Sequence, residues 1–344
     1  MNLKILNPND HPDWDVKLGR SNDSCFFQTA AWARVLEASY GFKPKYFGML
    51  ETDRFALLMP FMEIRSFLTG KRGVSLPFTD HCPPVVSNIE DLPAAVQAAI
   101  DYGERNGWSY LEWRHSGYSA GIHPPSETYY FHEIDLTKTD AELFQQLNDN
   151  NRRNIRKAAR EGLRVNIDSS LWSLREFYRL NLITRKRHGL PPQPFSFFRS
   201  VFDHVLSTGY GVIVTATHEE KVIAASVFFR FGTKALYKYG ASELKYQSLR
   251  PNNFVLWEAL RWLKDRGVET IDLGRTDPNN TGLLQFKRTW GARESLLNYY
   301  RYSMKEKAYV RRALQRTNPY TRLLANTPTS VLRIIGRLFY KHAG

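Results

Sequence analysis

The sequence predicts an α+β fold made of two similar domains, each built around a mixed, mostly antiparallel sheet. With 344 residues, of which 42% are hydrophobic, the chain is long enough to bury two cores. Hydrophobic periodicity gives the same order of elements twice: a helix, an antiparallel hairpin, a helix and a strand. When the copies are displaced by 160 positions, Gly107 falls on Gly267 and Glu112 falls on Asp272. This order fits one compact domain per copy.

The first copy begins with a helix whose apolar residues Trp32 and Leu36 recur on one face. A polar turn, "ETDR", then separates two apolar runs that are typical of strands. A proline-rich segment precedes the last helix and strand of this copy. The predicted elements are a helix over residues 28–41, strands over 45–50 and 55–64, a helix over 91–107 and a strand over 108–114.

The second copy repeats this order around the acidic turn "HEEK". Its predicted elements are a helix over residues 173–187, strands over 211–217, 222–231 and 235–242, a helix over 251–267 and a strand over 268–275. Because side chains alternate along a strand, Tyr237 and Tyr239 are expected on the same face. The linking region predicts a first domain at 1–137 and a second at 138–302, followed by a tail at 303–344.

The chain is strongly basic, and two segments are especially rich in positive charge. The formal net charge is +14, and the stretch from Arg301 onward holds ten Lys or Arg against one Glu. A second basic patch, Asn151 to Arg164, holds six basic residues and one acidic residue. Such patches attract phosphate-bearing partners such as RNA, nucleotide-linked substrates or anionic lipid, although a solvated helix face is the simpler interpretation.

The compartment is predicted from what the sequence does not contain. We expect a cytoplasmic protein, because the N-terminus lacks an apolar signal core and no apolar run is long enough to span a bilayer. Cys25 and Cys82 are expected to be reduced and structural. No phosphate-binding loop, dinucleotide fingerprint or zinc-ligand spacing occurs, so we expect no metal site and no resident cofactor.

Several phrases in this order are characteristic of one family. The segments "FFQTAAWARV", "NNRRNIRKAAREGL", "LYKYGAS" and "DLGR…GLLQFKRTWG" resemble Fem-type peptidoglycan bridge-forming transferases, over roughly residues 20 to 300. The resemblance implies two tandem acetyltransferase-like (GNAT) domains. It also implies transfer of an amino acid from aminoacyl-tRNA to the amine of an envelope precursor, a nucleotide- or lipid-linked muropeptide.

The resemblance implies a catalytic group late in the second domain. A Phe-Lys pair lies near the reacting groups in such proteins, and it matches Phe286 and Lys287. A lysine can stabilise a carbonyl oxygen as it becomes an oxyanion. Arg275 could orient a substrate carboxylate or phosphate, or pair with Asp272 or Asp277 instead. We expect all three candidates to lie at a cleft between the domains, the alternative for the pair being a surface lysine beside a core phenylalanine.

Substrate contacts are expected from both domains. A Thr-x-x-Arg pattern matches Thr184 and Arg187, and the resemblance implies that the arginine binds a substrate phosphate. A tyrosine of the following strand region corresponds to Tyr237 or Tyr239. The first-domain loop offers Asp80 and His81 where the family has a glycine-rich segment, and Leu36 replaces a lysine found in members that use a nucleotide-linked muropeptide. Adjacent residues on extended backbone point opposite ways, so Asp80 and His81 are not expected to pair directly.

The donor is indicated by one loop. GNAT enzymes hold the coenzyme A pyrophosphate at a glycine-containing turn before a helix, and the corresponding segment "SLRPNNFVLWEAL" has no glycine. Its candidate contacts are Arg250, Asn252 and Asn253, and the asparagines are expected to cap a helix starting near Pro251. Missing glycines favour aminoacyl-tRNA over coenzyme A. The alternatives that remain are a coenzyme A-dependent N-acetyltransferase of an amino sugar and a non-catalytic double-GNAT binding protein.

The tail predicts a basic amphipathic helix. In "TSVLRIIGRLFYKHAG", the cations Arg333, Arg337 and Lys341 recur every four residues. Apolar residues recur at helical spacing on another side: Ile334, Ile335, Leu338 and Phe339. Such a helix could lie on an anionic membrane surface and hold the protein at the inner face of the plasma membrane. It could equally pack on the body of the protein.

Overall fold

The computed structural model describes residues 3–116, 124–311 and 321–343, and the chain divides into two compact units. The first unit comprises residues 1–129, 296–315 and 338–344, and the second comprises residues 130–295 and 316–337. The units therefore differ from the consecutive domains expected from the sequence, because the chain returns to the first unit after the second. No helix among the described residues combines the length and apolarity that crossing a bilayer requires.

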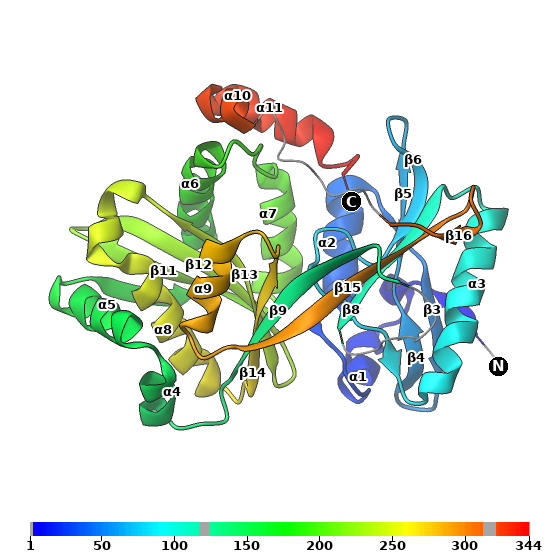
Figure 1. Cartoon of the computed structure of the whole chain (residues 1–344), viewed down its shortest axis with the longest axis horizontal. Coiled ribbons are helices and arrows are strands. Elements are labelled where there is room, and N and C mark those ends of the chain that lie inside the picture. The colour runs from blue at the N-terminus through cyan, green and yellow to red at the C-terminus, as the bar shows by residue number, and fades with distance from the viewer. Residues whose placement is uncertain (1–2, 117–123, 312–320, 344) are drawn as a thin grey trace. The chain divides into compact units, whose positions relative to one another are not determined.

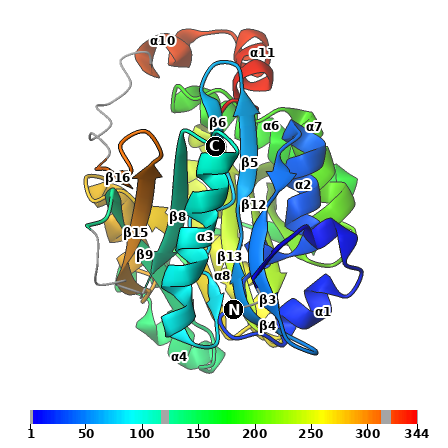
Figure 2. The same ribbon diagram turned by 90° about the vertical axis from the view of Figure 1, so that its right-hand side faces the viewer.

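The first unit combines strands of two sheets with α-helices and short 3₁₀ helices (Figure 1). Its elements are β1 (Lys4–Leu6), α1 (Trp14–Gly19), α2 (Ala30–Tyr40), β2 (Lys43–Pro44), β3 (Tyr46–Leu50), β4 (Phe55–Met59), β5 (Met62–Ser66), β6 (Gly70–Val74), β7 (Val85–Val86), α3 (Leu92–Arg105), β8 (Tyr110–Ser116) and β16 (Ala308–Tyr309). One sheet has the order β1-β3-β4-β7, and the other includes β8-β6-β5-β2. Helix α3 connects the two sheets and packs against both β3 and β8 (Figure 2).

The single strand predicted over residues 55–64 is wrong. Met59 ends β4 and Met62 begins β5, and the two strands belong to different sheets. Pro60 lies between them, and proline has no N–H to donate to a ladder and breaks the pairing of a central strand. The sequence also missed β6, which pairs in parallel with β8.

A buried ion network lies in the first unit. The Glu112 carboxylate on β8 accepts hydrogen bonds from Arg114 Nη2 at 2.8 Å and from Arg301 Nε at 3.0 Å. Burial alone would raise the pKa of Glu112, but the two guanidinium groups outweigh it and lower that pKa to about 2. Burial opposes the charge of Arg114 as well, but Tyr299 and the Glu112 carboxylate outweigh it and raise the pKa of Arg114. The Glu112 carboxylate and the two guanidinium groups therefore stabilise one another's charged forms.

The second unit contains the longer strands (Figure 1). Its elements are α4 (Asp140–Gln146), α5 (Asp149–Arg160), β10 (Arg164–Asp168), α6 (Leu171–Arg187), α7 (Phe195–Val201), β11 (Gly211–His218), β12 (Lys221–Phe231), β13 (Lys234–Ser242), α8 (Pro251–Lys264), β14 (Thr270–Thr276), α9 (Thr281–Arg288), α10 (Thr321–Asn326) and α11 (Thr329–Phe339). Strands β10 to β13 form an antiparallel meander. Helix α8 then leads to β14, which pairs in parallel with β13.

Two long strands take part in both units. Strand β9 (Glu127–Asp135) follows the first unit, and its residues Tyr130 to Asp135 pair with β14 in the second. Strand β15 (Arg293–Ser303) follows the second unit, and its residues Leu297 to Ser303 pair with β8 in the first. This pairing explains why residues 296–303 cluster with the first unit rather than with the predicted second domain.

Helix α11 lies in the tail, and its Gly336 lies close to the backbone of Pro192. A Cβ atom on Gly336 would lie 2.0 Å from the backbone oxygen of Pro192. Helix propensity alone favours alanine over glycine by about 1 kcal/mol. We nevertheless expect Gly336→Ala to loosen α11 and to speed amide hydrogen exchange in the helix. Gly282→Ala in α9 is the control, because nothing lies within 4 Å of its Cβ position. Slower exchange in α11 of Gly336→Ala would contradict the close packing.

Candidate functional site

The candidate site forms where β14 departs from regular pairing. Asp272 lies opposite Glu133 and Arg275 opposite Phe131, so two residues of β14 face one residue of β9. This is a β-bulge, and bulges often occur next to active sites because they redirect backbone groups. The bulged Gly274 has φ of +76°, in the left-handed region that favours glycine.

Lys287 reaches this bulge from α9. Asn280 caps the helix by accepting a hydrogen bond from the backbone N–H of Leu283 at 3.1 Å. The Lys287 side chain is only 4% exposed, and its Nζ donates to the carbonyl oxygens of Gly274 at 2.6 Å and Arg275 at 3.2 Å. The ammonium group is thereby fixed at the bulge, in surroundings of lower dielectric constant than water.

His132, which sequence reasoning missed, lies on β9 opposite the bulge. It is fully buried, and its Nε2 is 3.0 Å from a carboxylate oxygen of Glu294. Burial and the charge of Lys287 lower the pKa of His132, so the ring is neutral near pH 7. A neutral ring beside a carboxylate carries its proton on Nε2, which assigns Nδ1 as an acceptor.

Nδ1 of His132 is buried, and it has no hydrogen-bond partner within the described part of the chain. Buried polar atoms are usually hydrogen-bonded. Glu294 is held in turn by Arg288, whose Nη2 donates to it at 2.7 Å. The alternation of Tyr130, His132 and Ile134 was the available sequence signal, since it is typical of a strand with these three side chains on one face. The bulge opposite His132 carries no such signal.

Phe286 and Arg275 flank the lysine but differ in exposure. Phe286 is half-buried and packs on the core of the second unit, with its ring centroid 6.2 Å from that of Trp290. Arg275 is exposed, and its carbonyl oxygen is one of the two that hold Lys287. The structure therefore brings the three predicted catalytic residues together in one unit, with Lys287 buried and the guanidinium of Arg275 on the surface.

The expectation that Tyr237 and Tyr239 share a face is wrong. Adjacent residues Phe228 and Val227 of β12 pair with Tyr237 and Tyr239, so a bulge at Lys238 places the tyrosines on opposite faces.

Each tyrosine has its own surroundings. The Tyr237 ring stacks on Phe228 at 5.1 Å, and its hydroxyl lies 3.2 Å from Ser226 Oγ. The Tyr239 ring instead lies 5.5 Å from that of Phe198 on α7, and its hydroxyl donates to Gln193 at 3.3 Å. Burial raises the pKa of Tyr237. Because the two rings lie on opposite faces, they cannot both contact a substrate that binds on one side of the sheet.

Thr184 and Arg187 lie at the end of α6. The Thr184 hydroxyl lies 3.4 Å from the carbonyl oxygen of Ser242 and 3.3 Å from its backbone nitrogen, so it joins α6 to the end of β13. Arg187 is exposed in the last turn, with its Nη2 3.5 Å from His188 Nε2. Thr184 therefore has a structural contact, whereas Arg187 presents its charge to solvent.

The predicted capping of α8 by asparagines is wrong. The helix begins at Pro251, and its N-cap is Arg250, which has φ of +61° and no side-chain capping bond. Asn252 is exposed in the first turn, and Asn253 Nδ2 donates to Asn151 on α5 at 2.9 Å. The proline fixes the start of the helix, so both asparagines fall inside it. The Asn253 side chain thus joins α8 to α5.

Asp80 and His81 lie in the first unit. Both are half-buried in the segment after β6, and the carbonyl oxygen of Asp80 accepts a hydrogen bond from the Tyr299 hydroxyl at 2.7 Å. The Asp80 carboxylate also helps to raise the pKa of Arg114. Asp80 therefore has contacts that stabilise the loop, and its cationic neighbour is an arginine.

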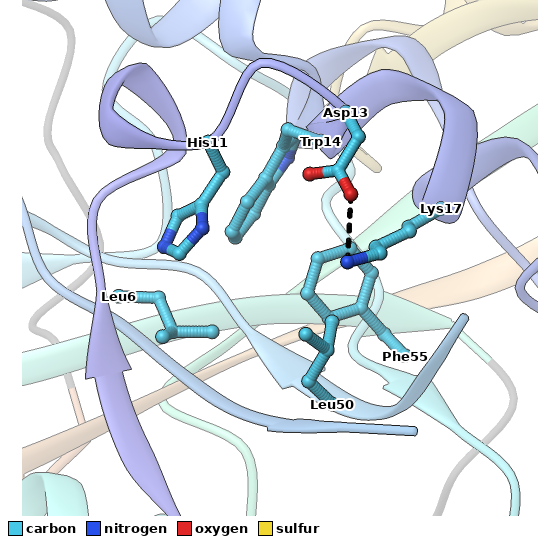
Figure 3. A pocket seen from close by; sticks show the side chains of 7 residues that line it. All are labelled: Leu6, His11, Asp13, Trp14, Lys17, Leu50 and Phe55. Atoms are coloured by element: carbon cyan, nitrogen blue, oxygen red, sulfur yellow. Dashed lines mark ion pairs between the residues drawn. The ribbon is translucent and has the colours of Figure 1, made fainter. Parts of the chain in front are cut away.

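A shallow hollow in the first unit lies elsewhere (Figure 3). It has space for no more than about a water molecule. Its lining residues are Leu6, His11, Asp13, Trp14, Lys17, Leu50 and Phe55. The ion pair drawn there joins Asp13 and Lys17 at 2.7 Å, and it lowers the pKa of the exposed Asp13. This hollow is too small to hold a substrate.

The predicted basic helix is α5, and its cations face outward. Asn151, Ile155 and Ala158 point into the unit, whereas Arg153 and Arg156 are exposed. Arg156 also lies over the Phe144 ring at 5.2 Å. The exposed cations form a surface that could contact phosphate groups.

The chain is similar to known proteins in sequence and in fold. Residues 146–288 match the acetyltransferase (GNAT) domain family, and this range includes the bulge and Lys287. The lipid II:glycine glycyltransferase of Staphylococcus haemolyticus (strain JCSC1435) is 22% identical over 255 residues. That match covers 53% of this chain and 60% of the relative, so the chain spans less than two thirds of the relative's length.

Solved structures show the same fold over most of the chain. The crystal structure of FemX has a TM-score of 0.68 at 15% identity, covering 87% of this chain and 97% of that one. A tandem GNAT protein from the clavulanic acid biosynthesis pathway has a TM-score of 0.53 at 9% identity, covering 88% and 98%. These comparisons confirm the predicted resemblance to Fem-type transferases and the predicted α+β fold with tandem GNAT-like domains.

Proposed function

We propose that this chain, which has the tandem GNAT fold of Fem-type transferases, forms an amide on a cell-envelope precursor. The substrate would be a peptidoglycan or polysaccharide intermediate that carries a free amine. The donor would be an aminoacyl-tRNA or another activated acyl group. Similarity to lipid II:glycine glycyltransferases supports this class of acceptor.

The observation that carries the proposal is the ammonium group of Lys287 fixed at the β14 bulge. In aminoacyl transfer the amine nitrogen attacks the ester carbon, and the carbonyl oxygen becomes an oxyanion. The bond to the ribose oxygen then breaks, and that oxygen takes the proton that the amine loses. A buried positive charge stabilises negative charge on either oxygen more strongly than an exposed one does.

Other residues of the second unit have roles in this proposal. Arg275 and Arg187 are the candidates for substrate phosphate or carboxylate, because both guanidinium groups lie on exposed side chains. Phe286 would wall off the lysine from water. Of the two tyrosines, Tyr239 is the better candidate for a substrate contact, since Tyr237 packs on the core of the second unit. Asp80 and His81 would belong to acceptor binding by the first unit.

The loop before α8 favours aminoacyl-tRNA as the donor. A side chain occupies the left-handed position, at Arg250, where a glycine would let backbone N–H groups approach a pyrophosphate. Asn253 already binds Asn151. Of the candidate cofactor contacts, Arg250 and Asn252 are thus left with exposed side chains.

We expect the chain to bind tRNA with steep salt dependence. Replacing Arg153, Arg156 and Arg160 on α5 by glutamine should weaken binding and lower the slope of log K against log salt by about one per lost phosphate contact. Replacing the exposed pair Lys305 and Lys307 by glutamine is the control. Filter binding at several salt concentrations measures both. Stabilisation by acetyl-coenzyme A with no tRNA binding at low salt would reverse the assignment of the donor.

The reaction itself is tested by product analysis. The purified chain is incubated with a mixed aminoacyl-tRNA pool and an amine-bearing muropeptide or amino-sugar precursor, and the products are analysed by mass spectrometry. The proposal expects a mass increase of one aminoacyl residue. An increase of one acetyl group with acetyl-coenzyme A would instead establish the N-acetyltransferase alternative. Ligand binding without a product from either donor would establish a non-catalytic binding protein.

A further inference from the structure

The apolar stripe of α11 faces solvent. Val331, Ile334, Leu338 and Phe339 are between 43% and 60% exposed. The first three recur at i, i+3 and i+7, which places them along one side of the helix. Single exposed apolar residues are ordinary, but a continuous row on one helix marks an interaction surface.

Another side of α11 holds the helix in place. Leu332 is buried, and Gly336 lies against the Pro192 carbonyl oxygen. Arg333 interacts with the hydroxyl of Tyr178 on α6, although the pKa of that tyrosine remains raised because of its burial. The helix is therefore anchored by Leu332 and Gly336, and the packing that anchors it leaves the stripe exposed.

The end of the chain is also anchored, within the first unit. His342 follows α11, and its carbonyl oxygen accepts hydrogen bonds from Arg72 Nη2 at 2.8 Å and from Thr69 Oγ1 at 3.3 Å. Both donors belong to the β5–β6 hairpin (Figure 2). The tip of this hairpin carries Phe67, which is 84% exposed while its ring lies 4.7 Å from that of His342. Leu68 beside it is exposed as well. The same end of the chain thus adjoins a second exposed apolar pair.

The charged residues of α11 and its flanking segments have one sign. Arg337 and Lys341 are exposed; Arg337 lies in the last turn of α11, and Lys341 follows the end of the helix. Residues 321–343 include no Asp or Glu. A surface of apolar residues bordered by cations is complementary to an anionic lipid bilayer, in which phosphate groups lie above an apolar interior. A second copy of this chain would bring like charges together, so the charge pattern disfavours self-association through α11.

We propose that α11 and the β5–β6 hairpin tip are membrane-docking surfaces for anionic lipid. The stripe Val331, Ile334 and Leu338 inserts at the boundary between headgroups and acyl chains, and Arg337 and Lys341 contact lipid phosphates. The hairpin tip is a separate surface of the first unit, where Phe67 and Leu68 insert between lipid headgroups. This docking is independent of the acyl-transfer reaction, because it depends on bulk anionic lipid rather than on a precursor.

Vesicle co-sedimentation of the full chain tests the docking surfaces. Vesicles of phosphatidylcholine alone are compared with vesicles containing phosphatidylglycerol, both without envelope precursor. The chain should sediment with the anionic vesicles at low salt and be released as salt rises. Replacing Ile334 and Leu338 by glutamate should lower the partition coefficient by about tenfold or more, because each change places a negative charge in the stripe.

Matched variants separate the contributions of the apolar stripe, the cations and the hairpin tip to vesicle binding. Val16→Glu on α1 is the control, since Val16 is a comparably exposed apolar helix residue and its replacement should leave binding unchanged. Arg337→Gln with Lys341→Gln should abolish most of the preference for anionic over neutral vesicles. Phe67→Ser should weaken binding, and circular dichroism verifies that each variant is folded.

Three results would overturn the docking proposal. The first is absence of the full chain from anionic vesicles at low salt. The second is equal binding by the Ile334→Glu, Leu338→Glu double variant and the Val16→Glu control. The third is a dimer in size-exclusion chromatography that the same double variant converts to a monomer, which would make the stripe a contact between copies. Each result leaves the proposed transferase reaction unaffected, so the two proposals fail separately.

Discussion

Replacing Lys287 by methionine should lower the turnover of acyl transfer by about a hundredfold or more, comparable with the loss of one oxyanion donor. Methionine has a similar shape but no charge, so it cannot stabilise an oxyanion. It also leaves the carbonyl oxygens of Gly274 and Arg275 without the Nζ donor, which should cost about 1–3 kcal/mol of stability. Turnover is therefore measured below the unfolding transition of the variant.

Lys287→Gln distinguishes a catalytic charge from a structural hydrogen bond. Glutamine can donate to a carbonyl oxygen but carries no charge. If the charge stabilises the transition state, Lys287→Gln should lose as much turnover as Lys287→Met while recovering part of the stability. Lys305→Met, at an exposed turn, is the control and should behave as the unmodified chain. Recovery of turnover by glutamine, or unchanged turnover in methionine, would refute the catalytic assignment.

Replacing Glu112 by glutamine should lower the free energy of unfolding by about 3 kcal/mol or more. The carboxylate neutralises Arg114 and Arg301, both of which donate to it. Removing one partner of a buried ion pair leaves the other charges uncompensated, and such losses are typically about 3–5 kcal/mol. Urea denaturation measures the change. Glu51→Gln is the control in the same unit, because its ion pair with Arg54 is exposed and contributes at most about 1 kcal/mol.

The same carboxylate predicts how acid affects stability. The pKa of Glu112 is about 2 in the folded chain, below its ordinary value of 4.5. The stabilisation is therefore present above about pH 4.5 and is lost as pH falls from there toward about pH 2, since the unfolded chain binds the proton first. Unfolding of Glu112→Gln should depend less on pH in this range. An identical pH dependence in both proteins would show that Glu112 is not the group responsible.

Much of the fold was predictable because it depends on periodicity. The helix predicted over residues 251–267 is α8, Pro251–Lys264, whose apolar side chains form the core of the second unit. The strand predicted over residues 211–217 is β11, Gly211–His218. A buried helix or strand must repeat its apolar residues at a fixed spacing, and this requirement is visible in a single sequence.

The details of the candidate site were less predictable, because they depend on pairing between distant residues. The bulge at Lys238 reverses the relation between Tyr237 and Tyr239, yet "LYKYGAS" alternates as a regular strand would. The bulge in β14 exists only relative to β9, more than a hundred residues earlier in the chain. Propensity at one position contains no information about a register shift with a distant partner.

The late pairing of β15 with β8 affects how the chain folds during its synthesis on the ribosome. When residues 1–129 have emerged, β8 still has an unpaired edge, with the apolar Leu111 and Trp113 on that strand. Its partner, residues 297–303 of β15, is translated only after strands β10 to β14 of the same sheet. An unpaired strand edge is open to pairing with other chains. The sheet of the nascent first unit therefore remains incomplete while more than half of the protein is made. A chain truncated before residue 297 would lack the strand that completes this sheet.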